Sequence, residues 1–291
     1  MPLHLGTNPL PAIHMRHRYS RLLILIATVL ACNGESGTTA PSEPPPPPPP
    51  APVLLRDIVI PSLPSPYYHF EYDTGGRVRT LSFASEFFTY EVLYEKDRIS
   101  EMRNITLATG TRLVYVYDDV GRVGAVKYID SNGVIFTVLF FSYDGPRLTG
   151  IERDRRVDGG FLIDKTVALS YFADGNLREL TEHRPAIEGH QDETTTVDHF
   201  EQYDDKINVD GFSLIHDEFF DHKVLLPGVQ LQKSNPARQT HTGDGTNYSV
   251  DFSYTYDGRN RPLTKTGALT FSNGPDAGKT FPTSSAFSYF D

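Results

Sequence analysis

Two stretches of this chain decide its fold: YDTGGRV at residues 72–78 and YDDVGRV at residues 117–123. They agree in Tyr, Asp, Gly, Arg and Val, and each has a further apolar residue nine positions after the Tyr. Looser copies begin at five more tyrosines, Tyr94, Tyr143, Tyr171, Tyr203 and Tyr256. Because the first copies follow one another at about 22 residues, the pattern is typical of a stacked supersecondary unit.

Each copy has the pattern of a strand, a turn and a second strand. An apolar or aromatic residue stands two positions before the Tyr in most copies, which is the period of a half-buried strand. The Asp can accept hydrogen bonds from turn amides, and the Gly adopts a conformation that other residues resist. We therefore predict that a strand ends at each Tyr and that a reversal of about three to five residues follows. The step of three from Val78 to Leu81, and again from Val123 to Val126, predicts a bulge or a late strand start in these two copies.

The predicted fold is all-β. No segment between residues 53 and 291 combines helical periodicity with caps, and turn signals recur about every ten residues. We expect one long antiparallel meander of repeated hairpins with roughly 14 strands, curled or partly closed into a barrel-like sheet. The predicted structural turn residues are Tyr72, Asp73, Gly76, Tyr117, Asp118, Gly121, Tyr143, Asp144, Tyr256 and Asp257.

The N-terminal region has the parts of a secretory signal. Residues 15–32 read MRHRYSRLLILIATVLAC, in which a basic cluster precedes the apolar run Leu22–Leu30 and a small residue precedes the chain's one Cys. That run is too short for a membrane span, which needs about 20 residues. The segment resembles a bacterial lipoprotein signal with its true start at Met15. This resemblance implies that Cys32 is the lipidated first residue; the alternative is a buried strand with an incidental Cys.

A Pro-rich segment follows the cysteine and runs without interruption from Pro44 to Pro50. Polyproline rises about 3.1 Å per residue, so residues 41–52 would reach on the order of 37 Å. We divide the chain into a lipoprotein signal at 1–31, a lipid anchor and linker at 32–52, and a Tyr–Asp-repeat β domain at 53–291. Asn33 after the cysteine resembles an outer-membrane sorting signal, which implies a lipid-anchored envelope protein on either the periplasmic or the surface side.

Composition excludes several classes of protein. The 291 residues are 38% hydrophobic, which is enough for a sizeable core, and one Cys cannot form a disulfide within the chain. The formal charge of -10 becomes -13 when removal of residues 1–31 takes away three Arg. This negative charge predicts that the domain does not bind nucleic acid, because proteins bind phosphate through Lys and Arg.

The Tyr–Asp copies resemble the repeats of the Rhs and teneurin families, in which strand–turn–strand units spiral into a large shell. The last third, with YDDKIN at 203–208, LQKSNP at 231–236 and RPLTKTG at 261–267, resembles uncharacterised Bacteroidota lipoproteins described as having a porin-like β fold. The resemblance implies an anchored envelope protein with no assigned activity and no catalytic residues.

Two runs, at 188–199 and 216–222, gather acidic residues and His, and Asp204, Asp205, Asn208 and Asp210 crowd oxygens before a Gly. Neither run has the spacing of a zinc motif, and the third group lacks the terminal Glu of a calcium loop. We therefore predict no metal, no cofactor and solvated acidic loops, with a weak divalent-cation site as the alternative.

We predict a membrane-anchored, non-catalytic envelope lipoprotein that binds a protein or a glycan. The alternatives are a carbohydrate-active hydrolase using loop carboxylates and a purely structural envelope scaffold. No nucleophile elbow or phosphate-cradling Gly loop favours an enzyme. We expect the rigid repeat surface to carry recognition, rather than loops at 182–200 and 235–247.

Overall fold

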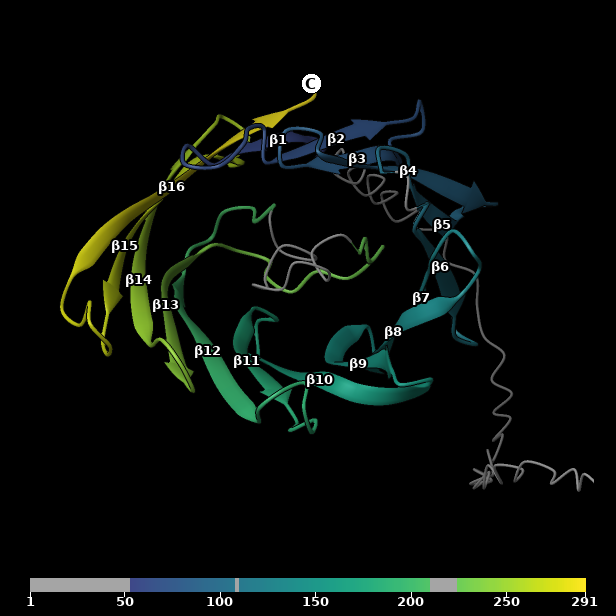
Figure 1. Cartoon of the computed structure of the whole chain (residues 1–291). Coiled ribbons are helices and arrows are strands. Elements are labelled where there is room, and N and C mark those ends of the chain that lie inside the picture. Colours follow the sequence, from purple (N-terminus) through teal and green to yellow (C-terminus); the bar gives the residue numbers. More distant parts are fainter. Residues whose placement is uncertain (1–52, 108–109, 210–223) are drawn as a thin grey trace, which may run out of the picture. The chain divides into compact units, whose positions relative to one another are not determined.

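The computed structural model describes residues 53–107, 110–209 and 224–291. Cys32, the signal, the Pro-rich linker, Asp210 and the acidic run 216–222 lie outside the described residues. The described residues form sixteen strands in one antiparallel sheet, and the sheet closes because β1 pairs with both β2 and β16 (Figure 1). The predicted all-β meander is confirmed, and its closure into a barrel is complete.

The strands follow one another around the barrel in chain order: β1 (Leu55–Val59), β2 (Tyr68–Tyr72), β3 (Val78–Phe83), β4 (Phe88–Glu95), β5 (Arg98–Asn104), β6 (Arg112–Tyr117), β7 (Val123–Ile129), β8 (Ile135–Asp144), β9 (Arg147–Val157), β10 (Gly160–Tyr171), β11 (Leu177–Arg184), β12 (Thr194–Tyr203), β13 (Pro236–Gly243), β14 (Tyr248–Tyr256), β15 (Pro262–Phe271) and β16 (Thr280–Tyr289). No helix in these described ranges is long and apolar enough to cross a membrane.

The strand count differs from the expected 14 for a simple reason. Each of the seven Tyr copies marks the junction of an even strand with the next odd strand, which accounts for β2 to β15. The strand β1 precedes the first copy, and β16 follows the last one. These two strands pair with each other and close the barrel.

The irregularity predicted after the turns at Tyr72 and Tyr117 is present. Glu71 and Tyr72 pair with Thr80 and Val78, so the register shifts by one residue at Arg79. The register shifts in the same way between β6 and β7, next to Tyr117. This prediction is therefore confirmed in both of the copies that suggested it.

The apolar side chains face the inside of the barrel. Directly paired residues in neighbouring strands share a face of the sheet. One such row, formed by Val92, Met102, Leu113 and Tyr128, is at most 5% exposed. The barrel interior is therefore a hydrophobic core in the region of β2 to β8.

The connection from β12 to β13 contributes to this core. Its residues Val224, Leu225 and Leu226 are 2–4% exposed, and the Leu225 N–H donates a hydrogen bond to the Tyr115 hydroxyl at 3.2 Å. Figure 1 shows the described part of this connection inside the ring of strands. The barrel is thus filled on this side by its own chain.

The expectation of loops at 182–200 and 235–247 was wrong for most of these residues. The strand β11 continues to Arg184, β12 starts at Thr194, and β13 covers Pro236–Gly243. Thr, His and Asp alternate between the two faces of these strands. A polar composition is compatible with strands here, because inward-facing Asp198 and His241 pair with each other at 2.9 Å across β12 and β13.

Candidate functional site

The Asp of the predicted turns organises each turn through its carboxylate. Asp73 accepts hydrogen bonds from the backbone N–H groups of Gly75 and Arg77 at 2.9 and 3.0 Å, and from the Arg77 guanidinium at 2.8 Å. The hydrogen bonds from the Arg77 backbone and side chain lower the pKa of Asp73 below its ordinary value of 3.8.

Asp118 and Asp257 repeat this arrangement. Each accepts a hydrogen bond from the backbone N–H of the Arg four positions on, Arg122 or Arg261, and one from its guanidinium, at 2.7–2.9 Å. The residue Asp144 is placed differently, because it is the last residue of β8 and pairs with Arg147. The turn that follows Tyr143 is therefore shorter than those after Tyr72, Tyr117 and Tyr256, and as short as the one after Tyr94.

Glycines complete the first two turns. Gly76 and Gly121 have φ values of +77° and +88°, in the left-handed region. A Cβ atom at Gly121 would also lie 2.7 Å from the guanidinium of Arg98. Both glycines lie in the turns and outside strand centres.

The tyrosine hydroxyls form a regular series of hydrogen bonds around one end of the barrel. In each even strand a terminal Tyr donates to a backbone carbonyl at the start of the preceding odd strand. The pairs are Tyr72–Leu55, Tyr94–Val78, Tyr117–Ile99, Tyr143–Val123, Tyr171–Leu148, Tyr203–Leu177, Tyr254–Pro236 and Tyr289–Pro262, at 2.5–3.0 Å. We call this series the hydroxyl ladder. In the copy that begins at Tyr256, the ladder hydrogen bond is made by Tyr254, two residues before the end of β14. The Tyr256 hydroxyl donates to the carboxylate of Asp204 instead.

The turn arginines lie over the next tyrosine of the ladder. The guanidinium carbons of Arg77, Arg122 and Arg261 are 4.3–4.6 Å from the ring centres of Tyr94, Tyr143 and Tyr289, respectively. This spacing is that of cation–π contacts. The arginine of one unit therefore packs on the tyrosine of the next, and the recurring sequence pattern is explained by contacts between units.

The carboxylates and His of the acidic run at 188–199 do not converge. Asp198 pairs with His241, at 2.9 Å, on one face of β12, while His199 contacts Glu179, at 3.3 Å, on the other. His190 lies 3.7 Å from Asp158 in a third place. Within residues 53–107, 110–209 and 224–291, no group of three or more His, Cys, Asp or Glu could hold a metal ion.

A buried ionic cluster on β9, β10 and β11 was not anticipated. Asp164, 2% exposed, accepts two hydrogen bonds from Arg153, 4% exposed, at 2.7 and 3.1 Å. Glu182 lies 3.7 Å from Lys165 and 2.7 Å from Arg184. Glu182 and Arg153 face the interior because they stand in register with the inward-facing Val167 and Leu139, a pairing that the sequence does not reveal.

The outer face of the barrel is polar over β3 to β5 and over β11 to β15, whereas exposed Val116 and Phe140 make it partly apolar on β6 and β8. Thr80, Glu91 and Arg103 form one outward row across β3, β4 and β5. A second row across β11 to β15 consists of Glu179, His199, Thr240, Ser249 and Thr270. Membrane-spanning barrels have an apolar band about 25 Å tall on the outside. Over these two sets of strands this barrel has the reverse polarity, with polar residues on the outside.

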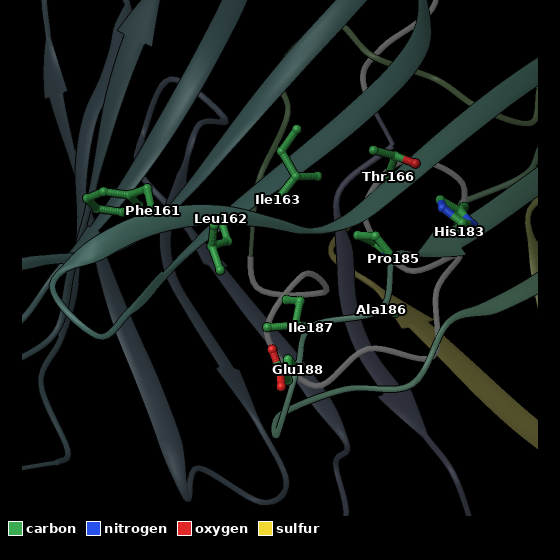
Figure 2. Close-up of a pocket in the computed structure, with 9 residues that line it drawn as sticks. All are labelled: Phe161, Leu162, Ile163, Thr166, His183, Pro185, Ala186, Ile187 and Glu188. Atoms are coloured by element: carbon green, nitrogen blue, oxygen red, sulfur yellow. The ribbon is translucent and has the colours of Figure 1, made fainter.

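A pocket of about 720 Å³ lies where β10 begins and β11 ends. Its walls are mostly apolar, and Figure 2 shows Phe161, Leu162 and Ile163 following one another along β10, with the chain from Pro185 to Glu188 across from them. Pockets of this size are typical of ligand sites. We call it the β10 groove; no feature of the sequence had singled it out.

The fold and these surfaces define a closed sixteen-stranded barrel of described residues. It has a hydrophobic core inside β2 to β8, an ionic cluster inside β9 to β11, polar outer rows on β3 to β5 and β11 to β15, and an apolar groove near its rim. This barrel is similar in structure to a porin-like protein from Bacteroides uniformis, with a TM-score of 0.55 and 15% identity over 77% of this chain and 89% of that one. It is also similar to a porin-like protein from Bacteroides vulgatus, with a TM-score of 0.54 and 14% identity over 81% and 99% of the two chains.

No family model matches the sequence, and the comparison with curated proteins finds no match. Because the sequence identities are only 15% and 14%, the structural likeness shows a shared fold and no more. It agrees with the porin-like β fold that the C-terminal motifs implied.

Proposed function

We propose that this protein is a lipid-anchored component of the bacterial envelope whose barrel stands in water and binds a partner without catalysing a reaction. The observation that carries this proposal is the reversed polarity of the barrel wall. Placing Glu91, Arg103 and Glu179 against lipid would cost several kcal/mol, since a single Arg at the bilayer midplane costs about 2–4 kcal/mol. A barrel with charged residues on its outer wall needs a separate anchor to stay at a membrane.

We propose that the lipoprotein signal provides this anchor. Cys32 carries the lipid, and the Pro-rich linker separates the lipid from the barrel. The porin-like proteins from Bacteroides support an envelope setting. The proposed location at the outer membrane rests on Asn33, the residue that follows Cys32.

Binding rather than catalysis is supported by the pairing of the buried carboxylates. Asp164 is held by Arg153, and Glu182 by Arg184 and Lys165. A glycoside hydrolase needs two carboxyl groups that face each other across a cleft, about 5–10 Å apart. These ion pairs instead fix carboxylates to the barrel wall.

Metabolic labelling with a fatty-acid analogue tests the anchor. The wild-type protein and the neighbouring control Asn33→Ala should take up the label, and Cys32→Ser should not, since the chain has no other Cys. Equal labelling of Cys32→Ser would disprove lipidation at this residue.

A further inference from the structure

We propose that the β10 groove binds an extended apolar peptide segment of a partner protein, which adds as a strand to the free edge of β10. This inference rests on the proposed function and names the chemistry of the partner. Peptide strands that add to an exposed sheet edge are held by main-chain hydrogen bonds and by pockets for alternate side chains.

The edge of β10 is open beside the apolar wall of the groove, from Gly160 to Ile163. The ladder between β10 and β11 begins at the pair Thr166–His183, whereas the ladder between β10 and β9 continues to Gly160–Val157. Residues 160–163 therefore have a described strand partner on the β9 side and none on the β11 side. An edge of this kind presents unpaired N–H and C=O groups.

The sequence explains why the sheet opens here. Pro185 follows directly after β11, and a proline has no N–H to continue a ladder. The amide of Gln191 then donates to the carbonyls of Asp164 and Pro185, at 2.9 Å each. This side chain spans the gap between β10 and the departing chain at one end, so the groove has a fixed width there.

The side chains at the open edge are apolar. Phe161, Leu162 and Ile163 are 43–47% exposed, although they are consecutive residues of one strand and point to alternate faces. Exposed apolar edge strands promote association, and natural proteins usually protect them with charges, prolines or short strands. An unprotected apolar edge beside a pocket indicates a binding surface.

A peptide strand fits this groove better than an acyl chain or a second copy. An acyl chain would cover Phe161 and Ile163 but could not pair with the backbone of the edge. A second copy would have to bring its own 185–188 segment into the same gap, and two copies of formal charge -13 repel each other. Only an extended peptide uses both the backbone edge and the apolar wall.

The charge near the groove favours acidic residues beside the apolar ones of the peptide. Arg155 and Arg156 pair with Leu162 and Phe161 in the ladder from β9. The Arg155 side chain is 55% exposed and lies 3.5 Å from Asp164. Arg156 is exposed and makes no ion pair with any residue of the described chain. Glu188 lies on the opposite wall of the groove.

Fluorescence anisotropy with a labelled synthetic peptide tests the proposal on the protein purified from cells. The probe alternates Val with Thr and carries an Asp at each end. A second version has methyl groups on every other backbone nitrogen, a third has Lys ends, and a fluorescent fatty acid serves as the acyl probe. The groove variant is Phe161→Thr with Ile163→Thr, and its matched control is Phe140→Thr on β8, which removes an equally exposed apolar side chain, 42%, outside the groove.

The proposal expects binding of the parent peptide to wild type and to Phe140→Thr, and binding at least about tenfold weaker for the groove variant, for the methylated peptide and for the Lys-ended one. Circular dichroism melts of both variants check that the barrel folds. Equal binding of the methylated peptide, preference for the fatty acid, or no binding of the parent peptide at millimolar concentration would overturn it. These outcomes do not depend on labelling of Cys32, so anchoring and peptide binding fail separately.

Discussion

The side chains of Asp57 and Ser288, 231 residues apart in the chain, are joined by a 2.7 Å hydrogen bond across the seam between the first and last strands. The other carboxylate oxygen of Asp57 lies 2.7 Å from Nδ1 of His69 on β2. One carboxylate therefore links the three strands that close the barrel. Although burial alone would raise the pKa of Asp57, hydrogen bonds from His69, Ser288 and Arg56 lower it.

Ser288→Ala should lower the free energy of unfolding by about 1 kcal/mol, the usual net value of a half-buried hydrogen bond. The measurement is urea denaturation followed by circular dichroism. Ser284→Ala on the same strand is the control, because Ser284 is exposed. If the two variants have the same stability, the seam does not depend on this hydrogen bond.

Tyr143→Phe should cost about 1 kcal/mol, because the carbonyl of Val123 loses its partner in the hydroxyl ladder. Tyr67→Phe is the control, since the Tyr67 hydroxyl makes no hydrogen bond with a described residue. A loss of stability as large in the control would show that removing any tyrosine hydroxyl, rather than the ladder position, causes the effect.

The ladder also predicts alkaline sensitivity. Burial raises the pKa of Tyr72, Tyr94, Tyr143 and Tyr171 from 10.0 to about 12. A raised folded-state pKa means that the contribution to stability is complete below pH 10 and is lost as the pH rises toward 12. Phenolate absorbance and circular dichroism, followed together, should show ionisation of these tyrosines above pH 10 coinciding with unfolding. Ionisation in a barrel that stays folded would contradict this.

Gly121→Val should destabilise the barrel by about 1–3 kcal/mol, since a branched side chain resists a positive φ and would meet Arg98. Gly258→Val, in the turn after Tyr256, is the matched control. Gly258 is not in the left-handed region, and a Cβ there meets no atom within 4 Å. Thermal melts of both variants give the comparison, and equal melting temperatures would refute the argument.

Asp118→Asn should make the barrel less stable at neutral pH and flatten its stability profile in acid. Burial opposes ionisation of Asp118, but hydrogen bonds from the Arg122 backbone and guanidinium lower its pKa below 3.8. The unfolded state then binds more protons, so this contribution is present above about pH 4 and is lost as the pH falls through the folded pKa. Denaturation curves collected from pH 7 to pH 3 measure the effect. If the stability of Asp118→Asn falls with decreasing pH as steeply as that of wild type, the prediction is contradicted.

The sequence predicted the barrel's repeating parts because they depend on local chemistry. An Asp that caps a turn, as Asp73 does, and a Gly with positive φ, as Gly121 has, are set by a few neighbouring residues. The ends of the meander were missed because pairing of β1 with β16 involves residues that share no motif.

The β10 groove and the ionic cluster could not be predicted for a related reason. The cluster depends on the register of three strands, which places Asp164 against Arg153. The groove depends on where one ladder stops, after Arg184, while its neighbour continues to Gly160. Its apolar residues, Phe161 to Ile163, are indistinguishable in sequence from a buried strand.

Membrane fractionation of wild type and Cys32→Ser tests most directly whether the barrel stands in water and is held by lipid alone. The wild-type protein should sediment with membranes and require detergent for its release. Cys32→Ser should instead be recovered without detergent as a folded β protein with the wild-type melting profile. If Cys32→Ser stays in the membrane pellet after alkaline extraction and is released only by detergent, the barrel itself is embedded in lipid and the account is contradicted.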